Sequence, residues 1–133
     1  MKLMTFALAA CGALIFAAPV WAHHSHAMYD ATHEVQLDGV IKEVRWSNPH
    51  VWMYFVVRGP DGKTKTWALE GPGVLQLQRK GFTEEGLKAG TPITISCYPL
   101  RSGGPGCLGG YVLALNGETL PPSQERHAGR EFD

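Results

Sequence analysis

The segment of residues 44–57, which reads VRWSNPHVWMYFVV, constrains the fold of this chain more than any other. After a Ser-Asn-Pro turn at residues 47–49, the residues alternate between two sets. The apolar set is Val51, Met53, Phe55 and Val57. The other set is His50, Trp52 and Tyr54. A period of two with β-branched and aromatic side chains is typical of a strand whose apolar face meets a core.

The first 22 residues have the features of a secretory signal peptide. Lys2 gives a positive start, residues 3–20 are almost wholly apolar, and Val20-Trp21-Ala22 fits a small-x-small cleavage site. Residues 8–11 (LAAC) resemble a lipidation box, but cleavage there would leave a signal too short to function. The sequence therefore predicts a periplasmic or secreted protein, cleaved after Ala22, with no membrane span in its mature form.

The remaining chain is long enough for one small domain with a core. We expect a His-rich mature N-terminal segment at 23–34, one β domain at 35–120 and a disordered polar tail at 121–133. The whole chain carries 12 basic and 12 acidic side chains, and removal of Lys2 leaves one net negative charge. A near-neutral chain without a basic stripe argues against nucleic acid as a partner.

The order of elements predicts a mainly β fold, a small five-stranded OB-like barrel. The expected strands are 35–46, 50–58, 63–70, 93–98 and 108–115. One short helix, expected at 74–80, lies between the third and fourth strands, which is the element order of an OB-like barrel. A small sandwich is the alternative, and the helix favours the barrel. Gly39 inside the first strand predicts a bulge.

Cys97 and Cys107 remain after the signal, with its Cys11, is removed. A pair of cysteines in an exported chain predicts a disulfide. A Cys-based copper site is the alternative, although the spacing matches none of the usual metal motifs.

Several short motifs occur together along the mature chain. They are the His23-His24-Ser25-His26 start, Trp46-Ser47-Asn48-Pro49-His50, Trp67-Ala68-Leu69-Glu70, and Arg79-Lys80-Gly81-Phe82 followed by Leu87 and Gly90. With these motifs the chain resembles an uncharacterised family of small secreted bacterial proteins, a domain of unknown function. The resemblance implies export and a compact β domain, but it brings no established activity that could be transferred to this chain. The cysteine pair is not part of it.

The mature N-terminus offers ligands for a metal. Cleavage after Ala22 gives His23 a free amine and a ring nitrogen that close a chelate, and the amine has a pKa of about 7.7–8.0 that a metal can displace. One more imidazole gives three nitrogens in a T, which suits Cu(II). His24, His26 and His50 are the candidates for that position, and Met28 would favour Cu(I).

Two alternatives to this copper site stay open. Cleavage one residue later would make His24-Ser25-His26 the chelate. The histidines at 23–26 also fit a flexible polar start without metal, and His50 fits a structural residue bonded to a turn.

A second kind of function would use aromatic side chains. Trp46, Trp52 and Tyr54, with Trp67 as a further candidate, could line a sheet face that binds a glycan, a small ligand or a periplasmic protein partner. Trp46 and Trp67 also fit the ends of the barrel as packing residues. The chain could, finally, be a structural or interaction domain without metal.

No motif predicts catalysis. The carboxylates Asp30, Glu34 and Glu70 are not paired with a nucleophile at a known spacing, so the sequence favours a binding protein over an enzyme.

Overall fold

The computed structural model describes residues 26–120 and the backbone of Arg126–His127. The elements, in chain order, are η2 (His26–Met28), β1 (Val35–Arg45), β2 (Trp52–Arg58), β3 (Thr64–Glu70), α1 (Val74–Arg79), β4 (Pro92–Pro99), β5 (Gly106–Leu115), β6 (Glu118–Thr119) and β7 (Arg126–His127). Each predicted strand and the predicted helix appears, with ends shifted by one or two residues. Within residues 26–120, neither helix is long and apolar enough to cross a membrane.

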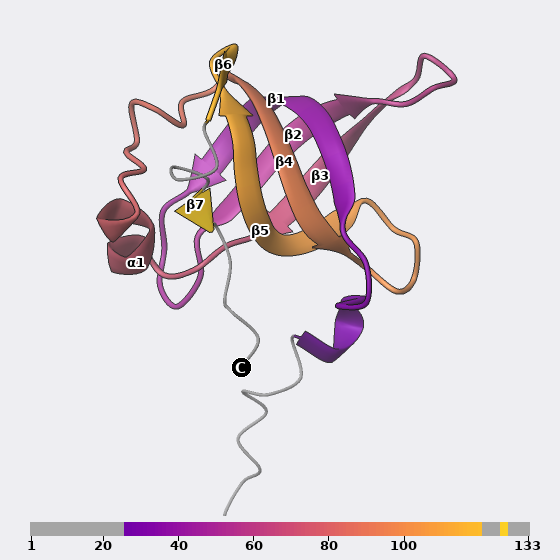
Figure 1. Ribbon diagram of the computed structural model, residues 1–133, viewed down its shortest axis with the longest axis horizontal. Coiled ribbons are helices and arrows are strands. Elements are labelled where there is room, and N and C mark those ends of the chain that lie inside the picture. The colour runs from indigo at the N-terminus through magenta and orange to yellow at the C-terminus, as the bar shows by residue number, and fades with distance from the viewer. Residues whose placement is uncertain (1–25, 121–125, 128–133) are drawn as a thin grey trace, which may run out of the picture.

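The strands close into a five-stranded barrel (Figure 1). β1 pairs antiparallel with β2 on one side and β4 on the other, β2 continues to β3, and β4 continues to β5. The barrel closes where β3 runs parallel to β5 through Ala68–Glu70 and Gly106–Leu108. This closure confirms the OB-like barrel, with the short helix between the third and fourth strands.

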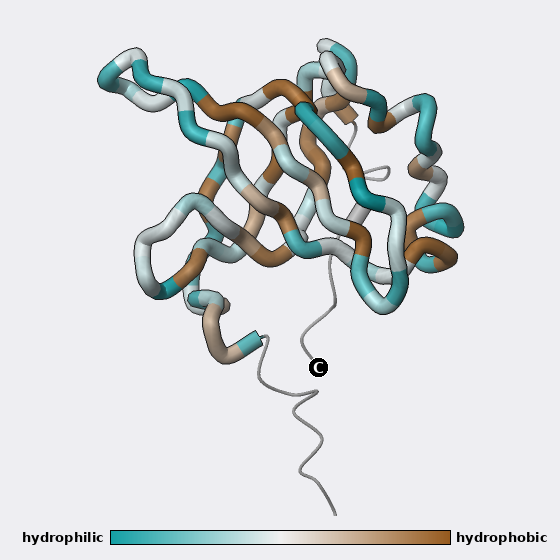
Figure 2. Tube along the Cα trace, turned by 180° about the vertical axis from the view of Figure 1, so that it is seen from behind, coloured by the Kyte–Doolittle hydropathy of each residue, from teal (hydrophilic) through white to brown (hydrophobic). Residues whose placement is uncertain are grey.

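The alternation in β2 directs its side chains as predicted. Val51, Met53 and Phe55 are buried in the core cluster, and Val57 packs against it with part of its surface exposed. The predicted inner face of β4, Ile93, Ile95 and Cys97, is buried in the same cluster. Along the strands, hydrophobic and hydrophilic residues alternate, as expected for a barrel with a filled interior (Figure 2).

The two ends of the barrel differ. Leu77 of α1 and the following Phe82 and Leu87 are buried against Val51 and Met53, so this segment closes one end. The β2–β3 hairpin projects from the barrel on the side away from α1, in both views of the molecule (Figures 1 and 2). No helix of the described chain covers that second end.

The predicted bulge at Gly39 is wrong. Gly39 pairs in regular register with Val57 of β2 and Ile93 of β4, and the shift in register lies between Ile41 and Glu43. The glycine serves close packing instead, because a Cβ on Gly39 would lie 2.8 Å from both Phe55 Cδ2 and the Val56 carbonyl oxygen. Sequence pattern cannot separate these two uses of a strand glycine.

Replacing Gly39 with alanine is expected to destabilise the barrel. The new methyl group would force the β1–β2 backbones apart, and overpacking of this kind costs about 1–3 kcal/mol. Urea unfolding followed by circular dichroism measures the change. Gly104→Ala is the control, because its Cβ would meet nothing closer than 3.5 Å. Equal stability of the two variants would contradict this role for Gly39.

The turns follow the sequence signals. Asn48–Pro49 is a cis peptide, Gly62 closes the β2–β3 hairpin with a positive φ of 77°, and Asn116 and Gly117 have φ of 53° and 80°. This last pair turns the chain into β6, a short strand that the sequence did not predict. The backbone of Arg126–His127, inside the predicted disordered tail, pairs with β5, and the other tail residues lie outside the described part of the chain.

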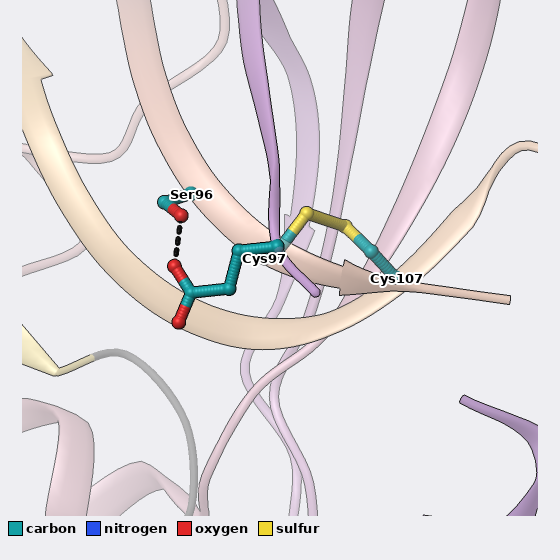
Figure 3. The surroundings of a disulfide bond; sticks show 4 residues. Ser96, Cys97 and Cys107 are labelled. Carbon is teal, nitrogen blue, oxygen red and sulfur yellow. Dashed lines mark hydrogen bonds between the residues drawn. A yellow bond between two sulfur atoms is a disulfide. The ribbon is translucent and has the colours of Figure 1, made fainter. Parts of the chain in front are cut away.

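The predicted disulfide joins Cys97 of β4 to Cys107 of β5, with the Cα atoms 5.8 Å apart (Figure 3). Both cysteines are fully buried. The neighbouring Ser96 side chain donates a hydrogen bond to Glu34, which ties the start of β1 to β4. Because Cys97 lies near the end of β4 and Cys107 near the start of β5, the disulfide joins the two ends of the loop between these strands.

Candidate functional site

The segment just before β1 packs on the outside of the barrel. Tyr29 forms a β-bridge with Leu100, in the loop between β4 and β5, and is 3% exposed. The Asp30 amide donates to the Pro99 carbonyl at 2.8 Å, and the Arg101 amide donates to the Met28 carbonyl at 2.9 Å. These bonds hold the N-terminal segment against the loop that the disulfide closes.

Tyr29 covers a carboxyl group at the end of β3. Its hydroxyl donates to Glu70 Oε2 at 2.9 Å, and Glu70 is only 4% exposed. Burial, followed by the hydrogen bond and the charge of Glu70, raises the pKa of Tyr29 above its ordinary value. Tyr29 and Glu70 are both buried, but neither belongs to the main core cluster. They form a separate buried polar contact outside the barrel interior, between the N-terminal segment and the end of β3.

The same carboxyl group lies beside His50. The His50 ring Nδ1 lies 3.0 Å from the Gly71 carbonyl oxygen and 3.4 Å from Glu70 Oε1. Since a carbonyl oxygen can only accept, Nδ1 carries the proton, and in the neutral ring Nε2 then holds the available lone pair. This arrangement fixes both the tautomer and the orientation of the imidazole.

His50 lies at the edge of the barrel where β3 ends, together with His26, Tyr29, Glu70 and Gly71, and we call this edge the rim. Local hydrogen bonds place His50 there. The Val51 amide donates to the Pro72 carbonyl, and the Gly71 amide donates to the Val51 carbonyl, at 2.9 and 2.8 Å. The Asn48 side chain accepts from the Val74 amide at 3.1 Å. The turn before β2 is therefore bonded directly to the connection between β3 and α1.

His26 and His50 line the same small pocket. Its cavity volume is about 20 Å³, and its walls also include Pro49, residues 71–73, Gln76 and Leu108. A cavity of this size has room for about one water molecule or one ion. The structure thus brings two of the four predicted metal ligands to one place. His23 and His24, the other two, lie outside the described residues.

Within residues 26–120, no three His, Cys, Asp or Glu side chains form a group that could hold a metal ion. Of the histidines in residues 26–120, His26 and His50 line this pocket, and His33 does not. Met28, the predicted soft donor, is 55% exposed at the end of η2.

The predicted aromatic face divides into two parts. Trp46 and Trp67 are partly buried and pack against the core cluster, which agrees with their alternative assignment as packing residues. Trp52 and Tyr54 are partly exposed, and the Arg45 guanidinium lies 4.9 Å from the centroid of the Tyr54 ring. One face of that ring therefore already has a cationic neighbour. Ligand binding by this face stays a prediction.

Sequence reasoning missed the role of Tyr29 and gave Glu70 only as an unpaired carboxylate. The sequence shows only that Glu70 alternates with Trp67 and Leu69, which places it on the other face of the strand, and the structure places it there, opposite Trp52. Its partner Tyr29 is 41 residues away in the chain, so the sequence offers no local pattern that joins them.

Comparison with known proteins adds the family. No curated protein and no solved structure matches the chain. Residues 12–109 match a family described as a family of unknown function (DUF6152), a match that includes the rim residues Tyr29, His50 and Glu70. The chain belongs to this family of unknown function (DUF6152).

Proposed function

We propose that this chain is an exported β-barrel protein that binds Cu(II) at the rim where His26 and His50 line one pocket. The observation that carries the proposal is that His50 and His26 line one pocket, with His50 Nδ1 lying 3.0 Å from the Gly71 carbonyl oxygen and 3.4 Å from Glu70 Oε1. Histidines that bind metals almost always donate the other ring N–H to a carbonyl or carboxylate, which orients the ring. His50 has both kinds of neighbour.

The remaining ligands would come from the mature N-terminus. With cleavage after Ala22, His23 supplies an amine and a ring nitrogen, and only two residues separate it from His26. These two nitrogens together with the imidazoles of His26 and His50 give the tetragonal, nitrogen-rich set that Cu(II) prefers. His50 then anchors the site to the rigid barrel, while the residues before His26 complete it.

The disulfide supports the exported part of the proposal. Disulfides persist in oxidising compartments such as the bacterial periplasm, and the Cys97–Cys107 pair is fully buried in the barrel. Export also provides the cleavage that frees the His23 amine.

A competition titration with Cu(II) tests the proposal on protein that begins at His23, as checked by intact mass. His50→Asn is the informative variant, because the asparagine amide can keep the donor to Gly71 but removes Nε2. We expect His50→Asn and His26→Asn each to weaken Cu(II) binding by at least about tenfold, equal to about 1.4 kcal/mol.

His33→Asn is the matched control. It also removes one imidazole, but His33 pairs with Asp30 at 3.2 Å and does not line the pocket. We expect it to bind Cu(II) as the unaltered protein does. Equal affinity of all three variants and the unaltered protein would overturn the rim as the copper site.

A further inference from the structure

A separate groove opens at the end of the barrel that α1 does not cover. It has a volume of about 660 Å³ and lies between the start of β1 and the β2–β3 hairpin. This volume is within the range of small-molecule sites, about 300–1,000 Å³. The groove shares no lining residue with the pocket of His26 and His50.

The floor of the groove continues the interior of the barrel. Residues directly opposite in an antiparallel pair share a face. Trp67 is opposite the fully buried Phe55, and Leu37 is opposite the buried Ile95, so both lie on the inner face. Leu37, Val57 and Trp67 all pack against the core but keep part of their surface exposed. The floor is therefore an indole and two aliphatic side chains.

Lysines stand beside this apolar floor. Lys65 is opposite Val57 and so extends from the same inner face of the hairpin, and Lys63 lies two residues before it. Both are exposed, and no side chain in the described part of the chain forms an ion pair with either ammonium group. Lysine on the inner face of a barrel hairpin interrupts an otherwise apolar pattern, which a partner of opposite charge would explain.

The acidic residues of the groove are already engaged within the fold. Asp38 accepts a hydrogen bond from the Thr94 hydroxyl at 2.7 Å, and Asp61 accepts from the Lys63 backbone amide at 3.1 Å. Arg58, the third cation, donates to the Gly62 carbonyl at 3.1 Å. The groove therefore combines three cationic side chains and two carboxylates, with the two lysines open to a ligand.

We propose that this groove binds a small amphipathic anion. An aromatic or aliphatic body would lie on Trp67, Leu37 and Val57, and its carboxylate, sulfonate or phosphate group would meet Lys63 and Lys65. Charge-assisted hydrogen bonds to lysine orient the anionic end, and the indole supplies a flat apolar surface for the body. The tip of the β2–β3 hairpin, next to the groove, is hydrophilic (Figure 2).

The probe for the test is 8-anilinonaphthalene-1-sulfonate, an aromatic anion whose fluorescence rises on binding. The native protein is expected to bind one molecule per chain in a saturable manner, with circular dichroism unchanged. The double variant Lys63→Gln/Lys65→Gln should bind it at least about tenfold more weakly. N-phenyl-1-naphthylamine, the same body without the sulfonate, should bind the native protein and this variant equally.

Lys42→Gln/Lys88→Gln is the control, because it removes the same charge from exposed positions outside the groove. Its affinity for the sulfonate should change less than twofold. Trp67→Phe should reduce energy transfer from tryptophan to the bound probe. Equal binding by the native protein and Lys63→Gln/Lys65→Gln, or no saturable binding up to about 1 mM, would overturn the proposal. Lysine-dependent sedimentation with phosphatidylglycerol vesicles would overturn it too, in favour of a membrane surface.

Discussion

Replacing both Cys97 and Cys107 with alanine is expected to lower the free energy of unfolding by about 2–5 kcal/mol. Their disulfide closes a loop with a sequence separation of 10 residues, which in the loop-entropy model alone accounts for about 2.5–3 kcal/mol. The rest comes from the lost packing of two fully buried sulfur atoms. Urea unfolding followed by circular dichroism measures the change.

The same variant should loosen the N-terminal segment. The loop between β4 and β5 carries the bridge from Leu100 to Tyr29 and the hydrogen bonds of Asp30 and Arg101. Without the disulfide, we expect faster hydrogen exchange at the Asp30 and Arg101 amides. Reduction of the unaltered protein should reproduce both effects, and a reductant should leave the double variant unchanged. A stability loss below about 1 kcal/mol would contradict the role assigned to the disulfide.

Tyr29→Phe is expected to lower the free energy of unfolding by about 1.5–3 kcal/mol, the range for a hydrogen bond to a charged group. The substitution keeps the ring but removes the hydroxyl group that donates to the buried Glu70 Oε2 at 2.9 Å. Thermal and urea unfolding measure the loss. Tyr54→Phe is the control, because Tyr54 is partly exposed and its ring remains available to Arg45, so its effect should stay within about 0.5 kcal/mol.

The contribution of Tyr29 also depends on pH, with a definite sign. Burial and Glu70 raise its pKa above the ordinary value of 10.0, so in the folded state it keeps a proton that the unfolded state has lost. This contribution is complete below pH 10 and is lost as the pH rises toward the folded-state pKa. The stability difference between the unaltered protein and Tyr29→Phe should therefore be constant from about pH 6 to 9 and shrink above it. A difference that grows above pH 10 would contradict the Tyr29–Glu70 contact.

Local pattern was sufficient for most of the barrel. The period of two in β2 and β4 identified which side chains face the core, and the glycine and proline turns located the hairpins. The cysteine pair was sufficient for the disulfide. These features depend on neighbours in the chain or on chemistry that few residues share, so they can be read without a structure.

The contacts between the N-terminal segment and the barrel could not be predicted from local sequence pattern. Tyr29 meets Glu70, and His26 lines a pocket with His50, only because the β4–β5 loop brings the N-terminal segment back onto the barrel. The predicted position of the bulge in β1 was wrong for a related reason. Gly39 looks like a bulge in sequence, but its neighbours Phe55 and Val56, from another strand, decide its role.

Copper at the rim, rather than on a free N-terminus, is the central claim, and paramagnetic broadening tests it most directly. Protein beginning at His23 and labelled with ¹⁵N is titrated with less than one equivalent of Cu(II), and amide signals are followed by NMR. Copper held by His26 and His50 should selectively broaden the signals of Gly71, Gly73, Gln76 and Leu108, which line the same pocket. The signals of the β2–β3 hairpin, on the other side of the barrel, should stay sharp (Figure 1). Broadening confined to residues before Met28, with these pocket signals unchanged, would contradict the claim.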